Sequence, residues 1–337
     1  MTAFNAWRVH AVEVDGKKKT EARFDSVTLE DLDSGATENN EVVIKAAWSD
    51  INYKDALAIS GAGRIMRKFP CVAGIDVAGT VVSTNDSRFS EGQEVLVTGC
   101  NLGEAVDGGY AEYVKVAGEA VIALPEGIST REAMAIGTAG FTAALAVHRM
   151  QQNAQTPEMG PIAVTGPTGG VGGLAVNMLS KLGFEVHAIT GKPDQDGYLK
   201  TLGAMEIVNR NELELAKRPL EKVKWGGVVD NLGGELLSSL IAETCDGGNV
   251  ASIGLAASHS LETTVMPFIL RGVNLLGINS VNVPLPVRMR VWERLATDLR
   301  PDQLDQMVAR EVPLAELDKV MSEYVQGTVT GRTLVKI

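Results

Sequence analysis

One stretch constrains the fold more than any other: residues 161–183, PIAVTGPTGGVGGLAVNMLSKLG, where an apolar strand, a glycine-rich turn and an amphipathic helix follow one another directly. Five further apolar strand patterns come after it, each preceded by a helical or turn segment, at 185–189, 206–208, 227–230, 249–253 and 273–277. Apolar strands that alternate with helices form a parallel sheet with helices on both faces. The sequence therefore predicts an α/β fold with a doubly wound parallel sheet.

The glycine-rich turn follows the spacing of a dinucleotide-binding fingerprint. Pro167-x-Gly169-x-x-Gly172 matches G-x-G-x-x-G, with proline in place of the first glycine. Gly169 would let the backbone approach a pyrophosphate, and Gly172 would let the helix pack closely on the strand. A glycine-rich turn that binds nothing is the alternative, but the strand–helix units that follow favour a nucleotide site.

The end of the second strand indicates which nucleotide is bound. Chains that bind NAD usually place Asp or Glu there, whereas this chain reads Thr190-Gly191-Lys192. Lys192 can pair with a 2′-phosphate, as can Arg210, which follows the third strand. The pattern therefore favours NADPH. Asp194 and Asp196 are the contrary evidence, since either would repel a phosphate, and Lys192 could also be a solvated turn lysine.

The length of 337 residues suggests two domains. Short alternating β segments such as 41–45, 80–82 and 94–97 dominate the first 125 residues. The strand–helix region occupies 126–299, and a late strand–helix–strand pattern in 300–337 suggests that the chain returns to the first domain. We therefore expect a β-rich domain of residues 1–125, completed by 300–337, and a dinucleotide-binding domain of residues 126–299.

Charge and hydropathy exclude several classes of partner. The net charge of -11 and the pI near 5.0 disfavour a wide surface for nucleic acid or an anionic membrane. The opening MTAFNAWRVH resembles no signal peptide, and the apolar stretch 135–147 is shorter than the roughly 20 residues of a membrane-crossing helix. We expect a cytoplasmic protein that acts on a small molecule.

Sequence blocks along the whole chain carry a family resemblance. They are 52–57 (NYKDAL), 68–70 (KFP), 74–76 (GID), 136–143 (IGTAGFTA), 266–271 (MPFILR) and 331–337 (GRTLVKI). Through them the chain resembles the medium-chain dehydrogenase/reductase superfamily, in its zinc-free branch of quinone-oxidoreductase-like proteins. Within that branch it is most similar to the acrylyl-CoA reductase group.

The resemblance implies a Rossmann domain joined to a GroES-like catalytic domain, with NADPH as cofactor. It also implies a homodimer, paired through the apolar sheet edge near 275–279, since an uncovered edge invites pairing. The cofactor contacts that it implies, together with those argued above, are Tyr53, Thr168, Gly169, Gly170, Val171, Thr190, Gly191, Lys192, Arg210, Leu255, Asn279 and Arg332. For Arg332 the plain alternative is a surface arginine.

The zinc-dependent relatives take their catalytic metal from a Cys, a His and a second Cys. The positions that match these ligands here are Asn52, Ile75 and Thr138, and none supplies a thiolate or an imidazole. The three cysteines of the chain are isolated in the sequence, without a C-x-x-C pair. A zinc site needs about three such ligands, so we expect no bound metal.

A nicotinamide without a Lewis acid is suited to a substrate that is already activated, such as a conjugated alkene. Hydride then adds to the β-carbon, and hydrogen-bond donors stabilise the enolate. We therefore expect reduction of acryloyl-CoA, or another short 2-enoyl-CoA, to the saturated thioester. A quinone or free-enone reductase is the nearest alternative. A non-enzymatic role, crystallin-like or RNA-binding, is the most distant one, and the negative charge opposes RNA binding.

Asn52 and Tyr53 are the candidate catalytic residues, because they stand at and beside the position of the lost first ligand. Tyr53 could pack on the nicotinamide or donate a hydrogen bond or proton to the enolate. Arg64, Arg67 and Lys68 form a short basic cluster suited to the phosphates of CoA. A solvated loop face explains these three charges equally well.

Overall fold

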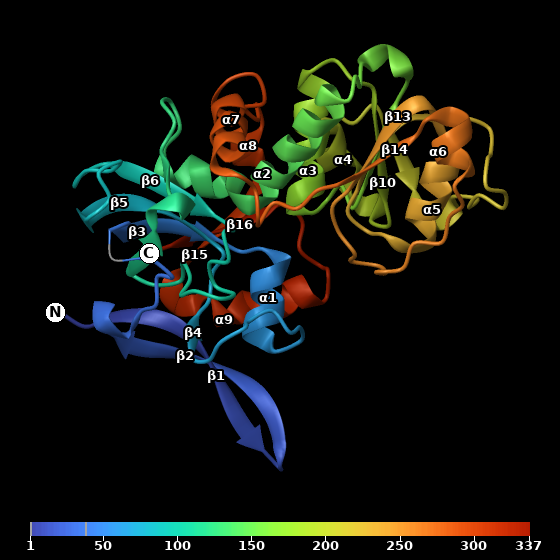
Figure 1. The fold of residues 1–337 in the computed structure, drawn as a ribbon. Coiled ribbons are helices and arrows are strands. Elements are labelled where there is room, and N and C mark those ends of the chain that lie inside the picture. The colour runs from blue at the N-terminus through green and yellow to red at the C-terminus, as the bar shows by residue number, and fades with distance from the viewer. Residues whose placement is uncertain (1, 38) are drawn as a thin grey trace. The chain divides into compact units, whose positions relative to one another are not determined.

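The computed structural model of the chain describes residues 2–37 and 39–337, which form two compact units (Figure 1). The first unit runs to Thr138 and also contains 281–292 and 304–337, and the second contains 139–280 and 293–303. The first boundary thus lies beyond residue 125. One reason is that the carbonyls of Met134 and Ala135 accept hydrogen bonds from Arg332, which belongs to the first unit.

The second unit is built on a six-stranded sheet whose order is β11-β10-β9-β12-β13-β14. The strands are β9 (Ile162–Thr165), β10 (Val186–Thr190), β11 (Glu206–Asn209), β12 (Trp225–Asp230), β13 (Thr244–Ser252) and β14 (Asn274–Gly277). All neighbours pair in parallel. The central strands β9 and β12 are buried along their whole length, as expected for a sheet covered on both faces. The predicted doubly wound sheet is confirmed.

Helices connect these strands and pack against them (Figure 1). They are α3 (Gly170–Lys181), α4 (Asp196–Thr201), α5 (Gly234–Ala242) and α6 (Met266–Arg271). The chain crosses from β9 through α3 and α4 to one edge of the sheet, and from β12 through α5 and α6 to the other. The strand order therefore reverses beside β9, which is where ligands bind in open α/β sheets.

The first unit contains two sheets. A seven-stranded sheet has the order β15-β16-β3-β5-β6-β8, with β7 also paired to β3, and a three-stranded sheet has the order β2-β1-β4. The strands are β1 (Phe4–Val14), β2 (Lys17–Val27), β3 (Glu41–Asp50), β4 (Cys71–Val72), β5 (Asp76–Thr84), β6 (Glu94–Thr98), β7 (Tyr113–Ala117), β8 (Ile122–Ala123), β15 (Val308–Pro313) and β16 (Arg332–Lys336). The last strand, β16, pairs with β3, so the C-terminal segment closes this unit.

The remaining helices are α1 (Tyr53–Ser60), α2 (Thr130–Gln152), α7 (Leu285–Ala296), α8 (Leu304–Met307) and α9 (Asp318–Val325). Helix α1 packs against α9 within the first unit. Helices α2 and α7 each begin in the first unit and continue into the second. None of the helices in the described part of the chain is long and apolar enough to cross a membrane.

The long hairpin of β1 and β2 was not among the predicted strands. Its two strands pair over eleven residues each, and Asp15 and Gly16 form the turn between them, both with positive φ. An Asp-Gly pair is the usual sequence of such a two-residue turn. The signal was therefore present in the sequence.

A buried ion pair fastens the C-terminal strand to the first unit. Arg332, 3% exposed, pairs with Asp50 at the end of β3, and its Nε donates to the carbonyl of Ala135 at 3.1 Å. Gly137 interrupts α2 with φ 52°, and a Cβ at that position would overlap the Asp50 carboxylate. Only glycine lets the helix backbone approach this pair. The cofactor contact of Arg332 stays a prediction.

We predict that Arg332→Met lowers the free energy of unfolding by about 3–5 kcal/mol, because it leaves Asp50 buried without its cation. Chemical denaturation monitored by circular dichroism measures the effect. The double variant Asp50→Asn/Arg332→Met, which buries neither charge, should recover part of the loss. A single variant as stable as the parent would show that the pair contributes nothing.

Candidate functional site

The glycine-rich turn of the second unit has the geometry of a phosphate-binding loop. It joins β9 to α3, and no side chain caps the first turn of α3, where Gly170 and Val171 lie. Helix N-termini of this kind hold anions through free backbone N–H groups. A Cβ on Gly172 would overlap the carbonyl oxygen of Gly166, so helix and strand approach as closely as predicted. Thr168 is buried beside this turn.

Two basic residues lie at the tip of the second strand. Thr190 ends β10, and its Oγ1 accepts a hydrogen bond of 3.0 Å from the backbone N–H of Lys192. Arg210 follows β11, and a Cβ on Gly191 would lie 3.1 Å from its Nη2, so the guanidinium lies against Gly191. The structure thus brings together Lys192 and Arg210, which the sequence separates by a strand and a helix.

Asp194 and Asp196, the two acidic residues that could repel a phosphate, lie just beyond this tip. Asp194 accepts a hydrogen bond of 2.7 Å from Gln195, and Asp196 begins α4. Burial lowers the pKa of Lys192, and the nearby Asp194 partly offsets that effect. Asp194 is therefore close enough to influence the ammonium group, although neither acid stands at the end of β10 itself.

The other predicted cofactor residues of this unit lie at the same edge of the sheet. Leu255 follows β13 and Asn279 follows β14, both parallel to β9 and β10. The carboxyl ends of parallel strands share one edge, which is the ligand edge of such folds. Leu255 is largely exposed there.

In the first unit, the carboxylate of Asp76 accepts hydrogen bonds from both Asn52 and Thr138, two of the positions that match zinc ligands. Asn52 donates from Nδ2 to Asp50 at 2.8 Å and to Asp76 at 2.9 Å. Thr138 donates to Asp76 from its backbone N–H at 2.7 Å and from its hydroxyl at 2.5 Å. Asp50 and Asp76 were not among the predicted site residues. The triplet Gly74-Ile75-Asp76 was the available signal for Asp76.

Asn52 uses both of its amide N–H groups inside this cluster, and its side chain also accepts from the backbone N–H of Asp55 in a capping box, so its polar atoms are engaged within the protein. Its backbone N–H donates to Asp55 at 2.9 Å, and Asp55 also accepts from the backbone N–H of Ile75 at 3.0 Å. Burial raises the pKa of Asp55 to about 7 despite these donors. The cluster therefore fixes the start of α1.

Tyr53, the first residue of α1, is 47% exposed. Its phenol forms no hydrogen bond with any other residue that the structure describes. The hydroxyl is therefore available to a bound molecule, as a catalytic or cofactor-contacting role requires.

The predicted basic cluster is divided by the fold. Lys68 pairs with Asp33 at 3.0 Å and with Asp107 at 3.1 Å, so its charge is neutralised within the first unit. The backbone N–H of Arg67 donates to the carbonyl of Glu104. Arg64 lies on the exposed loop after α1 and forms no ion pair with a described residue.

No three His, Cys, Asp or Glu side chains lie close enough to share a metal ion in the described ranges 2–37 and 39–337. The residues at the matched positions also have the wrong chemistry, since an amide, an alkyl group and a hydroxyl do not replace thiolate and imidazole ligands for zinc.

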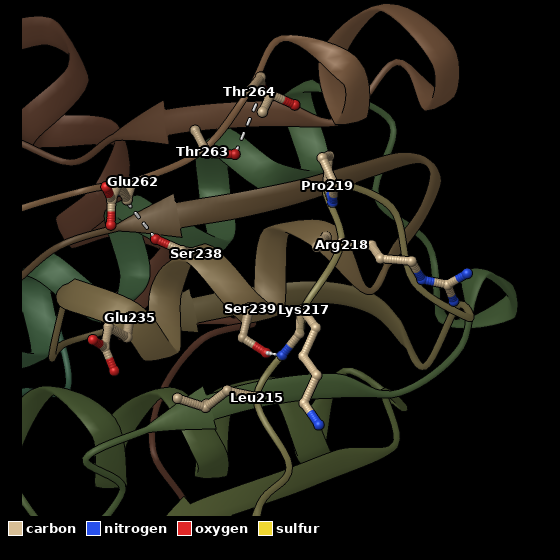
Figure 2. Close-up of a pocket in the computed structure, with 12 residues that line it drawn as sticks. Leu215, Lys217, Arg218, Pro219, Glu235, Ser238, Ser239, Glu262, Thr263 and Thr264 are labelled. Carbon is tan, nitrogen blue, oxygen red and sulfur yellow. Dashed lines mark hydrogen bonds between the residues drawn. The ribbon is translucent and has the colours of Figure 1, made fainter.

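A cavity of about 570 Å³ on the second unit contains none of the predicted site residues (Figure 2). It lies between the 215–219 segment, α5 and residues 262–264. Ser239 accepts a hydrogen bond from the backbone N–H of Ala216 at 2.8 Å, and Ser238 accepts one from Glu262 at 3.2 Å. These hydroxyls hold the two loops against α5, which is a structural role.

Comparison with known proteins places these features in a family. Residues 38–126 match the alcohol dehydrogenase GroES-like domain, and residues 170–297 match a domain described as zinc-binding dehydrogenase. The second match covers none of the positions 52, 75 and 138, so its description does not bear on the missing ligands.

Two curated relatives match nearly the whole chain. YhfP of Bacillus subtilis, named a quinone oxidoreductase, is 48% identical over 93% of this chain and 95% of its own. Acrylyl-CoA reductase AcuI of Ruegeria pomeroyi is 45% identical over 99% of both chains.

Solved structures agree with these relatives. The yhdH oxidoreductase of Salmonella enterica, in complex with NADP, superimposes with a TM-score of 0.92 at 45% identity over 99% of both chains. YhfP with NAD bound gives a TM-score of 0.93 at 46% identity over the full length of both. With its GroES-like first unit, its Rossmann second unit and its lost ligand positions, the chain belongs to the zinc-free branch of the medium-chain dehydrogenase/reductase superfamily.

Proposed function

We propose that this protein is an NADPH-dependent reductase of the carbon–carbon double bond of acryloyl-CoA or a related short 2-enoyl-CoA. The observation that carries the reaction class is the set of Asn52, Ile75 and Thr138, which fills the three matched ligand positions with an amide, an alkyl group and a hydroxyl in place of thiolate and imidazole. The relative named acrylyl-CoA reductase, matched over 99% of the chain, supports the substrate.

The cofactor proposal rests on the tip of β10. Lys192 and the Arg210 guanidinium against Gly191 offer two cations where a 2′-phosphate attaches, and no acid stands there to hold a free ribose hydroxyl. The uncapped N-terminus of α3 fits the pyrophosphate. The NADP of the Salmonella relative agrees with this assignment, whereas the NAD of YhfP shows that NAD also occurs among close relatives.

NADPH, when bound, supplies the hydride that forms the new bond to the β-carbon. The thioester carbonyl oxygen then carries negative charge, and the α-carbon requires a proton. Tyr53 stabilises that charge or delivers the proton through its exposed phenol. Asn52 is a positioning residue, because its amide N–H groups are engaged by Asp50 and Asp76 and fix the helix on which Tyr53 stands.

A quinone or enone reductase is the second candidate. The relative YhfP, named a quinone oxidoreductase, favours it at 48% identity. A quinone is also activated without a metal, so the same cluster serves both reactions. The two candidate functions therefore differ in whether the protein has side chains that bind the CoA part of the substrate.

We further propose a homodimer formed through the edge of the second unit. Strand β14 is the edge strand, and exposed apolar side chains gather on it and on the segment around α6: Val265, Ile269, Leu270 and Leu275. Ile269 is 71% exposed. An open edge beside an exposed apolar surface is unfavourable in a monomer.

We predict that Lys192→Ala and Arg210→Ala each raise the KM for NADPH by about tenfold to a hundredfold, the worth of one charge-assisted phosphate contact. The KM for NADH should not change. Lys200→Ala, an exposed lysine on the neighbouring α4, is the control. An unchanged NADPH preference in both variants would contradict the assignment.

We predict that acryloyl-CoA is reduced with a higher kcat/KM than a simple quinone, and that free acrylate is not reduced, because its carboxylate charge resists hydride attack. NADPH oxidation with the three compounds, and with crotonyl-CoA, measures this. Tyr53→Phe should lower kcat by about 10²–10⁴-fold if the phenol delivers the proton. Tyr113→Phe, whose ring packs on Phe4, is the matched control. A quinone that outperforms both thioesters would favour the second candidate.

We predict that the protein sediments as a dimer at micromolar concentration and that Ile269→Glu converts it to a monomer, because a charge would be buried in the apolar contact. Met205→Glu changes an equally exposed apolar residue that precedes β11, at the opposite edge of the sheet, and should leave the dimer intact. A monomeric parent protein would refute the proposed interface.

A further inference from the structure

A second cavity, of about 680 Å³, lies on the first unit between the β1–β2 hairpin and the end of α1. We call it the hairpin pocket. Its lining comes from residues 11–13 and 18–20 of the hairpin, Ala58 and Gly61 of α1 and its cap, and the loop residues 63–66 and 69. Figure 1 shows the hairpin extending beneath α1.

The walls of the hairpin pocket are held by close packing. Gly61 caps the C-terminal end of α1, and a Cβ on it would lie 2.5 Å from Oγ1 of Thr20, so the helix end lies directly on β2. The backbone N–H of Gly63 donates to Leu57 at 3.2 Å, and that of Ile65 donates to Gly63 at 3.0 Å. These contacts fix the loop that carries Arg64.

The hairpin pocket has an excess of positive charge in an acidic protein. Arg64 and Lys18 line it, and neither forms an ion pair with another described residue, whereas the side chain of Lys19, which is also part of the lining, lies on the opposite face of β2. Lys18 lies on the same face of β2 as Thr20, because side chains alternate along a strand, and so faces α1. Glu13, paired in register with Lys18, is the one acidic residue of the lining.

An apolar surface accompanies these charges. Val12, Ile65, Met66 and Phe69 also line the hairpin pocket, and Phe69 is 42% exposed. An exposed aromatic ring beside cations suits a ligand that joins a nucleobase to phosphates, since the base stacks on the ring while the cations take the anionic oxygens.

We propose that the hairpin pocket binds the 3′-phosphoadenosine diphosphate end of the CoA thioester, with Lys18 and Arg64 on the phosphates and Phe69 against the adenine. This inference rests on the proposed function and identifies how that substrate is held. Tyr53 begins α1 and the pocket lies at its other end, roughly 12 Å away along an eight-residue helix. CoA carries its phosphates at the end of a long pantetheine arm, whereas a quinone has no group that would reach this pocket.

Calorimetric titration of adenosine 3′,5′-bisphosphate into enzyme saturated with NADP⁺ tests the site, because the cofactor site is then filled. Lys18→Ala and Arg64→Ala should each weaken binding about tenfold or more. Arg64→Lys should restore part of the affinity. Lys17→Ala removes the same charge from the next position, on the opposite face of β2, and should bind as the parent does.

Kinetics provide an independent measurement. The parent enzyme should show a lower KM for acryloyl-CoA than for the thioester of 3′-dephospho-CoA, and the Lys18→Ala/Arg64→Ala variant should show equal KM values for the two. Bisphosphate binding that is unchanged in the double variant would overturn the hairpin pocket.

The two proposals fail in different ways. Reduction of acryloyl-CoA with the same KM in parent and double variant would remove the hairpin pocket and keep the function. Bisphosphate binding that is lost in the double variant, in an enzyme that does not reduce acryloyl-CoA, would keep the site and remove the function.

Discussion

The first unit depends on the buried ion pair between Arg332 and Asp50. The Arg332 guanidinium lies beside Asp50, and the carboxylates of Asp55 and Asp76 belong to the same buried region. Charges taken out of water are costly unless they are paired and hydrogen-bonded. Arg332 belongs to the last strand of the chain, so its pairing with Asp50 requires that the C-terminal segment docks on β3.

The same cluster explains how this scaffold is organised without a metal. In the zinc enzymes that the sequence resembles, a cation joins the start of α1 to the residue after Gly74 and to the break in α2. Here Asp76 makes two of these connections with hydrogen bonds, to Asn52 and to Thr138. The architecture of the site is thereby kept, while the Lewis acid is not.

Local patterns predicted most of the second unit. Each strand there is a short apolar run and the glycine turn is continuous in sequence, so periodicity alone placed β9, α3 and the tip of β10. The position of Arg210 beside Gly191 followed from the same topology, because strand tips in a parallel sheet share one edge. The Asp15-Gly16 turn was equally local and could have predicted the hairpin.

The interactions that the sequence did not predict join distant segments. Lys68 resembled a substrate-binding lysine until the fold placed it between Asp33 and Asp107. The resemblance placed Arg332 near the cofactor, with a surface arginine as the alternative, whereas the fold buries it against Asp50, which lies 282 residues earlier in the chain. Spacing carries no information about such contacts, because they are set by which strands become neighbours.

The double role of the Asn52 amide limits how this protein could return to zinc chemistry. Replacing Asn52, Ile75 and Thr138 with Cys, His and Cys would restore the ligand types, but it would also remove the amide that donates to both Asp50 and Asp76. The metal-free form of such a protein would hold two buried carboxylates without their shared donor, beside a new thiol. When the ligands are introduced one at a time, the step that replaces Asn52 therefore lowers the stability of the metal-free protein. This loss opposes a return from the zinc-free state to zinc binding.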